Sequence, residues 1–165
     1  METTNDPVCC PKFDPAPWDN VNFEWNDKIF VKGSVFTFFY MPCNFGSVMK
    51  KMDQRITEAG ASWSEMICLS DHTSKWNMDL YISVDKPVKT LEQKLLTGKF
   101  YSKVYEGPFK DTGIWHKDFE KLLAEKGLVQ SKIYLWYTTC PKCAKKYGKN
   151  YVVMIAKVGK FIPNT

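Results

Sequence analysis

Asn77-Met78-Asp79-Leu80-Tyr81-Ile82 and Asn150-Tyr151-Val152-Val153-Met154-Ile155 are the two stretches that decide the predicted fold. Each begins at an Asn and continues as a largely apolar run, which is typical of a buried β-strand. Before each stretch the chain shows the same order of a strand, an amphipathic helix that ends at a glycine, and another strand. A pattern that recurs within 165 residues indicates two copies of one unit. The alternative is that this order arises by chance in a small α+β domain.

Each copy is predicted to follow the order β-α-β-β. The first helix carries apolar residues at three-and-four spacing from Phe45 to Ile56 and ends near Gly60. The second helix is expected from about residue 111 to residue 126, with Gly127 after it. The predicted strands cover residues 29–40, 63–69, 78–84, 100–105, 132–138 and 151–158. Residues 70–77 are expected to form a turn.

The chain is predicted to form one α+β domain at residues 29–160, with pseudo-repeats at residues 29–88 and 95–158. An N-terminal arm precedes it at residues 1–28, where four prolines interrupt any helix or strand. Aromatic side chains of this arm, such as Trp18 and Trp25, predict that it is ordered and packs on the domain.

The composition excludes several classes of protein. The net charge of +5 comes from scattered basic residues, which lack the dense stripe of a nucleic-acid-binding surface. No window approaches the apolar length of a membrane span. The acidic, polar start of the chain does not resemble a signal peptide, so we expect a cytoplasmic protein whose six cysteines are reduced. The oligomeric state is left open.

A family resemblance rests on Tyr105-Glu106-Gly107-Pro108-Phe109, the helix with Trp115 that follows, and Gly127. This pattern resembles GyrI-like proteins, which are relatives of the effector-binding domains of AraC-type and MerR-type regulators. The resemblance implies that the two units form one concave antiparallel sheet with both helices on one face. It also implies a groove that binds a small aromatic or cationic molecule.

Because no helix-turn-helix segment accompanies the domain, the chain resembles a stand-alone member of this family. Some stand-alone members resemble hydrolases that open reactive electrophilic natural products. Two features depart from the common pattern. The strand Ile133-Tyr134-Leu135-Trp136-Tyr137 carries no acid, and Cys140-Pro141-Lys142-Cys143 is an addition. The cysteine-containing variant resembles uncharacterised bacterial proteins that carry the general name hydrolase.

Aromatic residues make up 15% of the chain, which suits a pocket for a flat apolar ligand. A sheet face that the helices leave uncovered would present them as a trough that stacks planar molecules and attracts cations. The alternative is that the N-terminal arm packs over these rings. The predicted ligand-binding residues are Trp63, Trp76, Tyr101, Tyr105, Trp136 and Tyr137.

Glu106 and His72 are the predicted catalytic residues. Glu106 ends a strand at the Gly-Pro turn, and a carboxylate in an aromatic groove tends to have a raised pKa and can protonate a leaving group. His72 follows Asp71 and can act as a general base near neutral pH. The alternatives are a surface carboxylate for Glu106 and a turn in which Asp71 caps backbone amides. His116 is expected to be solvated.

Four cysteines form the candidate metal site. The pair Cys140 and Cys143 has the spacing of half a tetrahedral zinc site, and Cys9 and Cys10 form a second pair. Adjacent cysteines chelate one metal awkwardly, so the alternatives are reduced thiols in a turn or a redox pair. No cofactor is required by the sequence, and structural zinc is the candidate.

Three functions remain open from the sequence. The first is a hydrolase that detoxifies a reactive aromatic or electrophilic compound. The second is a non-catalytic module that sequesters a ligand or contacts another protein. The third is a zinc-binding protein that uses its cysteines.

Overall fold

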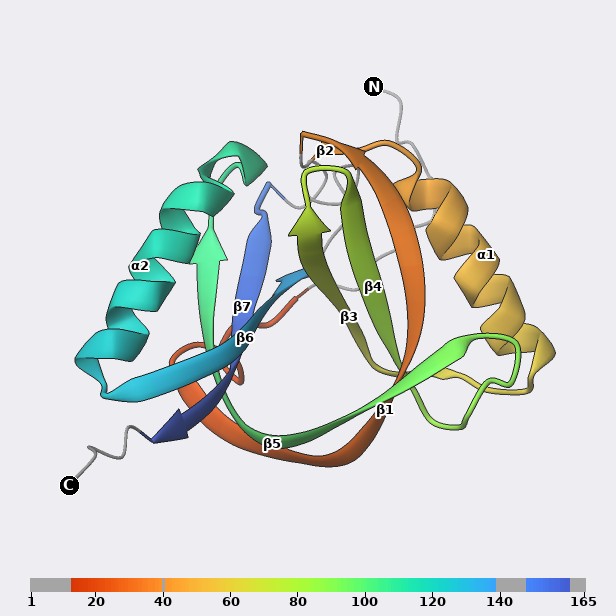
Figure 1. The fold of residues 1–165 in the computed structure, drawn as a ribbon, viewed down its shortest axis with the longest axis horizontal. Coiled ribbons are helices and arrows are strands. Elements are labelled where there is room, and N and C mark those ends of the chain that lie inside the picture. The colour runs from red at the N-terminus through yellow and green to blue at the C-terminus, as the bar shows by residue number, and fades with distance from the viewer. Residues whose placement is uncertain (1–12, 40, 139–147, 161–165) are drawn as a thin grey trace.

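The computed structural model describes residues 13–39, 41–138 and 148–160. Each half has one helix and three principal strands, so the predicted order β-α-β-β is present twice (Figure 1). The first half contains β1 (Val21–Phe38), the short β2 (Met41–Pro42), α1 (Phe45–Glu58), β3 (Trp63–Ser74) and β4 (Asn77–Val84). The second half contains β5 (Glu92–Glu106), a 3-10 turn (Phe109–Asp111), α2 (Thr112–Glu125), β6 (Leu128–Tyr137) and β7 (Tyr151–Lys160).

All seven strands belong to one antiparallel sheet with the order β2-β1-β4-β3-β6-β7-β5. The predicted single antiparallel sheet is therefore confirmed. An additional pairing between β1 and β5 joins the two ends of this order, so the main strands close into a ring. The closure is possible because Phe30 to Lys32 pair with β4 on one side and with β5 on the other.

The two halves meet at two seams of very different length. At the first seam, β1 pairs with β5 from Val21 to Lys32. At the second seam, β3 and β6 pair only at Leu69 with Trp136 and at Ser70 with Leu135. This narrow seam lies near the centre of Figure 1, between the half that carries α1 and the half that carries α2.

Side chains alternate along each strand, so the ring has an inner and an outer face. The inner face holds a mainly aromatic core formed by Trp25, Phe30, Ile67, Leu69, Tyr81, Leu96, Phe100, Tyr134, Trp136, Val153 and Ile155. The outer face carries both helices, each over its own apolar cluster. The expected placement of two helices on one face of a concave sheet is confirmed, and the inner face is filled by side chains.

Each helix is held by a small set of buried residues. α1 buries Met52 and Ile56, and Gly33 of β1 provides the space for the Met52 thioether because a Cβ at this position would collide with it. α2 buries Trp115, Phe119 and Leu123, which recur every fourth residue and therefore share one face. Burying one such side chain stabilises the fold by roughly 1.5–3 kcal/mol.

Two boundaries differ from the sequence prediction. β1 starts at Val21, before the predicted domain boundary at residue 29, because Trp25 belongs to the inner core and its segment pairs with β5. β3 continues to Ser74, so the predicted turn at residues 70–77 is wrong over most of its length. Among the described residues, no helix has both the length and the apolar character to cross a membrane.

Candidate functional site

A cleft of about 360 Å³ lies where β3 and β6 separate beyond their short pairing. β3 contributes Ser70, Asp71 and His72, β6 contributes residues 130–133 and Leu135, and α2 contributes His116 and Glu120. The volume is at the lower end of the range that holds small molecules. The cleft therefore brings charged and imidazole side chains from both halves to one small space.

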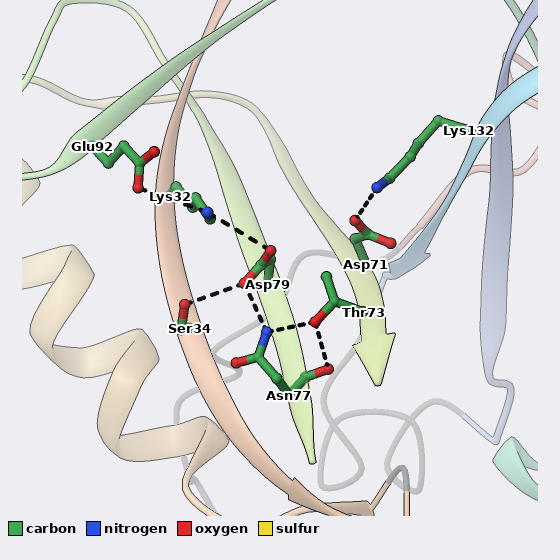
Figure 2. A network of polar contacts seen from close by, with 8 residues as sticks. All are labelled: Lys32, Ser34, Asp71, Thr73, Asn77, Asp79, Glu92 and Lys132. Atoms are coloured by element: carbon green, nitrogen blue, oxygen red, sulfur yellow. Dashed lines mark hydrogen bonds and ion pairs between the residues drawn. The ribbon is translucent and has the colours of Figure 1, made fainter. Parts of the chain in front are cut away.

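Asp71 and Lys132 form an ion pair across the narrow seam. The Lys132 Nζ atom lies 2.6 Å from the Asp71 Oδ2 atom, and Figure 2 shows the two side chains pointing toward each other from neighbouring strands. Asp71 is buried, and it lies directly opposite Asp79 in the β3–β4 register. Like charges at opposed positions repel, so the lysine offsets the repulsion between these two carboxylates.

Asp79 is held by residues of the first half alone, as Figure 2 shows. Its carboxylate accepts hydrogen bonds from the Ser34 hydroxyl at 3.2 Å and the Asn77 amide at 3.0 Å. Lys32 lies 3.8 Å from its other oxygen and is itself 3.7 Å from Glu92. Asp79 is therefore fixed within its own half, whereas Asp71 faces Lys132 of the second half and lies on the inner face close to Tyr81 and Tyr134.

His72 lies in β3, opposite Met78, and not in a turn as predicted. Burial lowers the pKa of His72 from its ordinary value of 6.5, and the negative charge of Asp71 opposes this shift. An imidazole with a lowered pKa is neutral at pH 7 and can accept a proton. A neutral imidazole that lines a cleft is the kind of group that can act as a general base.

The opposite wall of the cleft is formed by α2. His116 Nδ1 lies 3.4 Å from Glu120 Oε1, one helical turn further on. The side chain of His116 is 42% exposed, so it is partly solvated, as expected, but it also lines the cleft. The sequence signalled neither this wall nor Lys132, because both depend on contacts between segments that are far apart in the chain.

Glu106 does not line the cleft. It is exposed and ends β5, which is separated from β3 by β7 and β6 in the sheet order. The two residues predicted to act together, Glu106 and His72, are therefore carried by strands that are not neighbours.

The six predicted ligand-binding aromatics are distributed over different surfaces. Trp136 lies on the inner face, where Phe13 and Trp18 of the N-terminal arm pack on it. Tyr101, Tyr105 and Tyr137 belong to the cluster under α2.

The remaining two lie in the first half. Trp63 packs under α1 and donates its Nε1–H to Asp53 at 2.9 Å. Trp76 is 47% exposed and contacts Phe38 and Phe39. Alternation along the strands separates these rings, since residues of opposite parity face opposite sides of a sheet.

The predicted metal ligands Cys9, Cys10, Cys140 and Cys143 lie outside the described residues. Within the described part of the chain, no group of three or more His, Cys, Asp or Glu side chains is arranged to hold a metal ion. Burial raises the pKa of Cys68 to about 12, so this thiol stays protonated at neutral pH.

Comparisons with known proteins agree with this fold. A family model described as bacterial hydrolase matches residues 1–158. The crystal structure of the EcmrR C-terminal domain matches with a TM-score of 0.69 at 10% identity, covering 87% of this chain and 99% of that chain. An uncharacterised conserved protein from Listeria innocua matches with a TM-score of 0.58 at 8% identity, covering 86% and 92% of the two chains. No curated protein matches the chain. The structural matches confirm the effector-binding fold that the GyrI-like resemblance implied.

Proposed function

The chain belongs to the bacterial hydrolase family, and on this premise we propose that it hydrolyses a small electrophilic molecule in the cleft between β3 and β6. The observation that supports the proposal is that His72, Asp71 and Lys132 all line one small cleft at the point where β3 and β6 separate, with His72 on the helix-covered side and the Asp71–Lys132 ion pair on the inner side. A neutral imidazole, a carboxylate and an ammonium group are sufficient for general-base attack by water on a polarised carbon.

In the proposed mechanism, His72 accepts a proton from a water molecule that attacks the substrate carbonyl. Lys132 stabilises the negative charge that develops on the carbonyl oxygen, and Asp71 positions its ammonium group. The bond to the leaving group then breaks, and the leaving group takes the proton from His72. The net reaction adds one water molecule and yields an acid and an alcohol or amine.

The lining of the cleft favours a compact polar substrate over a large aromatic one. Among the described residues that form it, the apolar contribution comes from Ile133 and Leu135, and none is Phe, Tyr or Trp. A small ester is the simplest substrate that fits a polar cleft of about 360 Å³. The electrophilic part of the substrate expectation is retained, and the aromatic part has no support from this lining.

The test is the hydrolysis of a panel of small p-nitrophenyl and alkyl esters by the wild type and by His72→Gln. We expect His72→Gln to lower kcat/KM at least about 100-fold, because it removes the general base. Glu106→Gln serves as the comparison, and it is expected to stay within about twofold of the wild type because Glu106 lies outside the cleft. Unchanged turnover in a folded His72→Gln variant would sink the proposed mechanism.

A second candidate is a ligand-binding module without catalysis. The observation that favours it is that Asp71 and Glu120 of the cleft already have charged or imidazole partners. This candidate predicts that the wild type turns over no ester in the panel, although a bound ester raises its melting temperature.

A further inference from the structure

Four exposed aromatic residues lie together at one end of the sheet. Phe36 and Phe38 belong to the end of β1, Phe39 follows them, and Trp76 lies with Lys75 in the turn between β3 and β4. Each of the four aromatic residues is about half exposed. Figure 1 shows the end of β1 beside the β3–β4 turn at the top of the view. We call Phe38, Phe39, Lys75 and Trp76 the aromatic tip.

Contacts within the protein hold the aromatic tip in shape. The ring of Phe38 lies 4.8 Å from that of Phe39, and Trp76 lies 5.6 Å and 5.1 Å from these two rings, measured between centroids. The buried Thr37 joins the two turns, because its N–H donates to the Trp76 carbonyl at 2.9 Å and its hydroxyl donates to the Lys75 carbonyl at 2.7 Å. A preformed surface of this kind loses little freedom when it binds a partner.

The backbone at Phe39 is unfavourable for the residue that occupies it. Its φ is 47°, a left-handed conformation that glycine and asparagine adopt far more readily than a bulky aromatic residue. The ring is more than half exposed, so burial within the fold offsets little of this strain. Strained residues cluster at sites that contact ligands, and a strained residue with an exposed ring indicates a contact outside the chain.

The segments that build the aromatic tip and the adjacent start of α1 contain no acid. Neither residues 36–52 nor residues 72–78 include an Asp or a Glu, whereas they include Lys50, Lys51 and Lys75, all exposed. The rise of about 1.5 Å per residue places Lys50 and Lys51 within about 10 Å of the first residue of α1. Positive charge and exposed rings therefore occur together at this end of the molecule.

This charge distinguishes between the partners that an aromatic surface can take. The Nζ atom of Lys75 lies 5.7 Å from the centroid of the Phe39 ring, so the charge is among the rings. The acids that flank the β3–β4 turn, Asp71 and Asp79, are buried and lie near Lys132 and Lys32. A second copy of the chain would bring like charges together, whereas an anionic surface would meet the lysines and the rings at once.

We propose that the aromatic tip docks the protein on an anionic lipid surface. Trp and Phe rings enter the boundary between headgroups and acyl chains, and nearby lysines bind the anionic headgroups. Two adjacent turns that present rings at one end of the molecule suit a flat bilayer. The contact is peripheral, so it needs no membrane-spanning segment, and it does not depend on the hydrolase activity proposed for the cleft.

The test is co-sedimentation of the full chain with sucrose-loaded vesicles made of equal parts phosphatidylcholine and phosphatidylglycerol. We expect the wild type to sediment with the vesicles and Phe38→Ser/Phe39→Ser to bind at least about tenfold more weakly, because two inserting rings are lost. The matched control is Leu95→Ser/Ile114→Ser, which removes two exposed apolar side chains elsewhere and should bind like the wild type.

Two further variants separate lipid contact from a structural role. Lys75→Gln keeps every ring and should weaken binding several-fold, because one charge near the headgroups is lost. Phe39→Gly should weaken binding several-fold while the melting temperature stays equal or rises, because glycine relieves the positive φ. A ring needed only for the fold would instead lower the melting temperature and leave vesicle binding unchanged. Cooperative unfolding of each variant is required first.

Three results would overturn the proposal. The first is a wild type that stays in the supernatant with the anionic vesicles, or that binds vesicles of phosphatidylcholine alone equally well. The second is a control variant that loses as much binding as Phe38→Ser/Phe39→Ser. The third is a wild type that binds poly-L-glutamate through the aromatic tip but does not bind vesicles, because this would assign the surface to an acidic protein partner.

Discussion

Lys132 of β6 and Asp71 of β3 join the two halves at 2.6 Å, just beyond the point where backbone pairing between these strands ends. Beyond this point the backbones separate, and the ion pair between the side chains connects the two strands instead. It also places one positive and one negative group at the cleft, so the same contact serves the fold and the candidate site.

Loss of the lysine is expected to destabilise the protein more than loss of the aspartate. Lys132→Gln leaves a buried carboxylate that faces Asp79 without its cation, which costs about 2 kcal/mol. Asp71→Asn removes the repulsion together with the pair and costs about 1 kcal/mol, because the lysine side chain is 41% exposed and can be solvated. Urea unfolding of both single variants and the double variant measures these values and their coupling. Equal and additive losses would show that the pair contributes nothing across the seam.

The lowered pKa of His72 predicts a specific dependence of stability on pH. Between the lowered folded pKa and the unfolded value of about 6.5, the unfolded state binds more protons than the folded state. The stability of the wild type therefore falls as the pH drops through this window, and His72 imposes no penalty above it. The measurement is the unfolding free energy of the wild type and His72→Gln from pH 8 to pH 5, and the difference should shift in favour of the variant at low pH. His116→Gln is the control, and a pH-independent difference for His72→Gln would contradict the prediction.

Tyr105 is expected to act in stability and not in ligand binding. Its hydroxyl donates to the Asp118 carboxylate at 2.6 Å, and its ring stacks on Trp115 under α2. This hydrogen bond is the largest cause of a lowered pKa of Asp118, and the hydrogen bond from Lys103 is the next largest. The contribution of the Tyr105–Asp118 hydrogen bond to stability is therefore lost as the pH falls below about 4 and Asp118 is protonated. Tyr105→Phe should cost at most about 1 kcal/mol at pH 7 and less at pH 3. A variant of unchanged stability that no longer binds a ligand would instead restore Tyr105 as a binding residue.

Gly107 is expected to tolerate no side chain. Its φ is +147°, and a Cβ would lie 3.0 Å from Cζ2 of Trp115, which is 8% exposed. Gly107→Ala should lower the unfolding free energy by about 2 kcal/mol or more. Gly113→Ala is the matched control, because this helical glycine has nothing within 4 Å of an added Cβ. The control should be neutral or stabilising by up to about 1 kcal/mol, and thermal unfolding of both variants decides the comparison.

Structural zinc remains a prediction from Cys9, Cys10, Cys140 and Cys143. If the four thiolates hold one ion, elemental analysis of protein purified without chelator gives about one zinc per chain. Cys140→Ser/Cys143→Ser should abolish the zinc content, and Cys43→Ser should not. Metal-free protein with four titratable thiols at these positions would eliminate the site.

The local features of the fold were readable from the sequence. The apolar run that begins at Tyr151 is β7, and the Gly107-Pro108 turn precedes the helix with Trp115, as expected. These patterns depend on neighbouring residues, so periodicity and backbone preference determine them. One helical position shows the limit of such patterns: Ile114 of α2 is apolar, but its side chain is 67% exposed. The face is set by Trp115, Phe119 and Leu123, and Ile114 lies beside it.

The site was predicted less well because it depends on pairing between distant segments. His72 was identified, but Lys132 comes from the other half and reaches Asp71 only because β3 and β6 meet. The sequence also did not determine which side chains of each strand point toward the helices. The position of Tyr101 on the helix-covered face could therefore not be assigned from its spacing. Trp25 was placed in an arm because four prolines precede it, although its ring completes the inner core.

The closed ring has a consequence for each half considered as a separate chain. A half produced alone would expose the backbone edges of the strands that normally meet the other half, β1 and β3 in one case and β5 and β6 in the other. Unpaired edges of this kind recruit further strands. Such a fragment would be driven to associate with a second copy of itself, and the duplicated chain is the covalent form of that dimer.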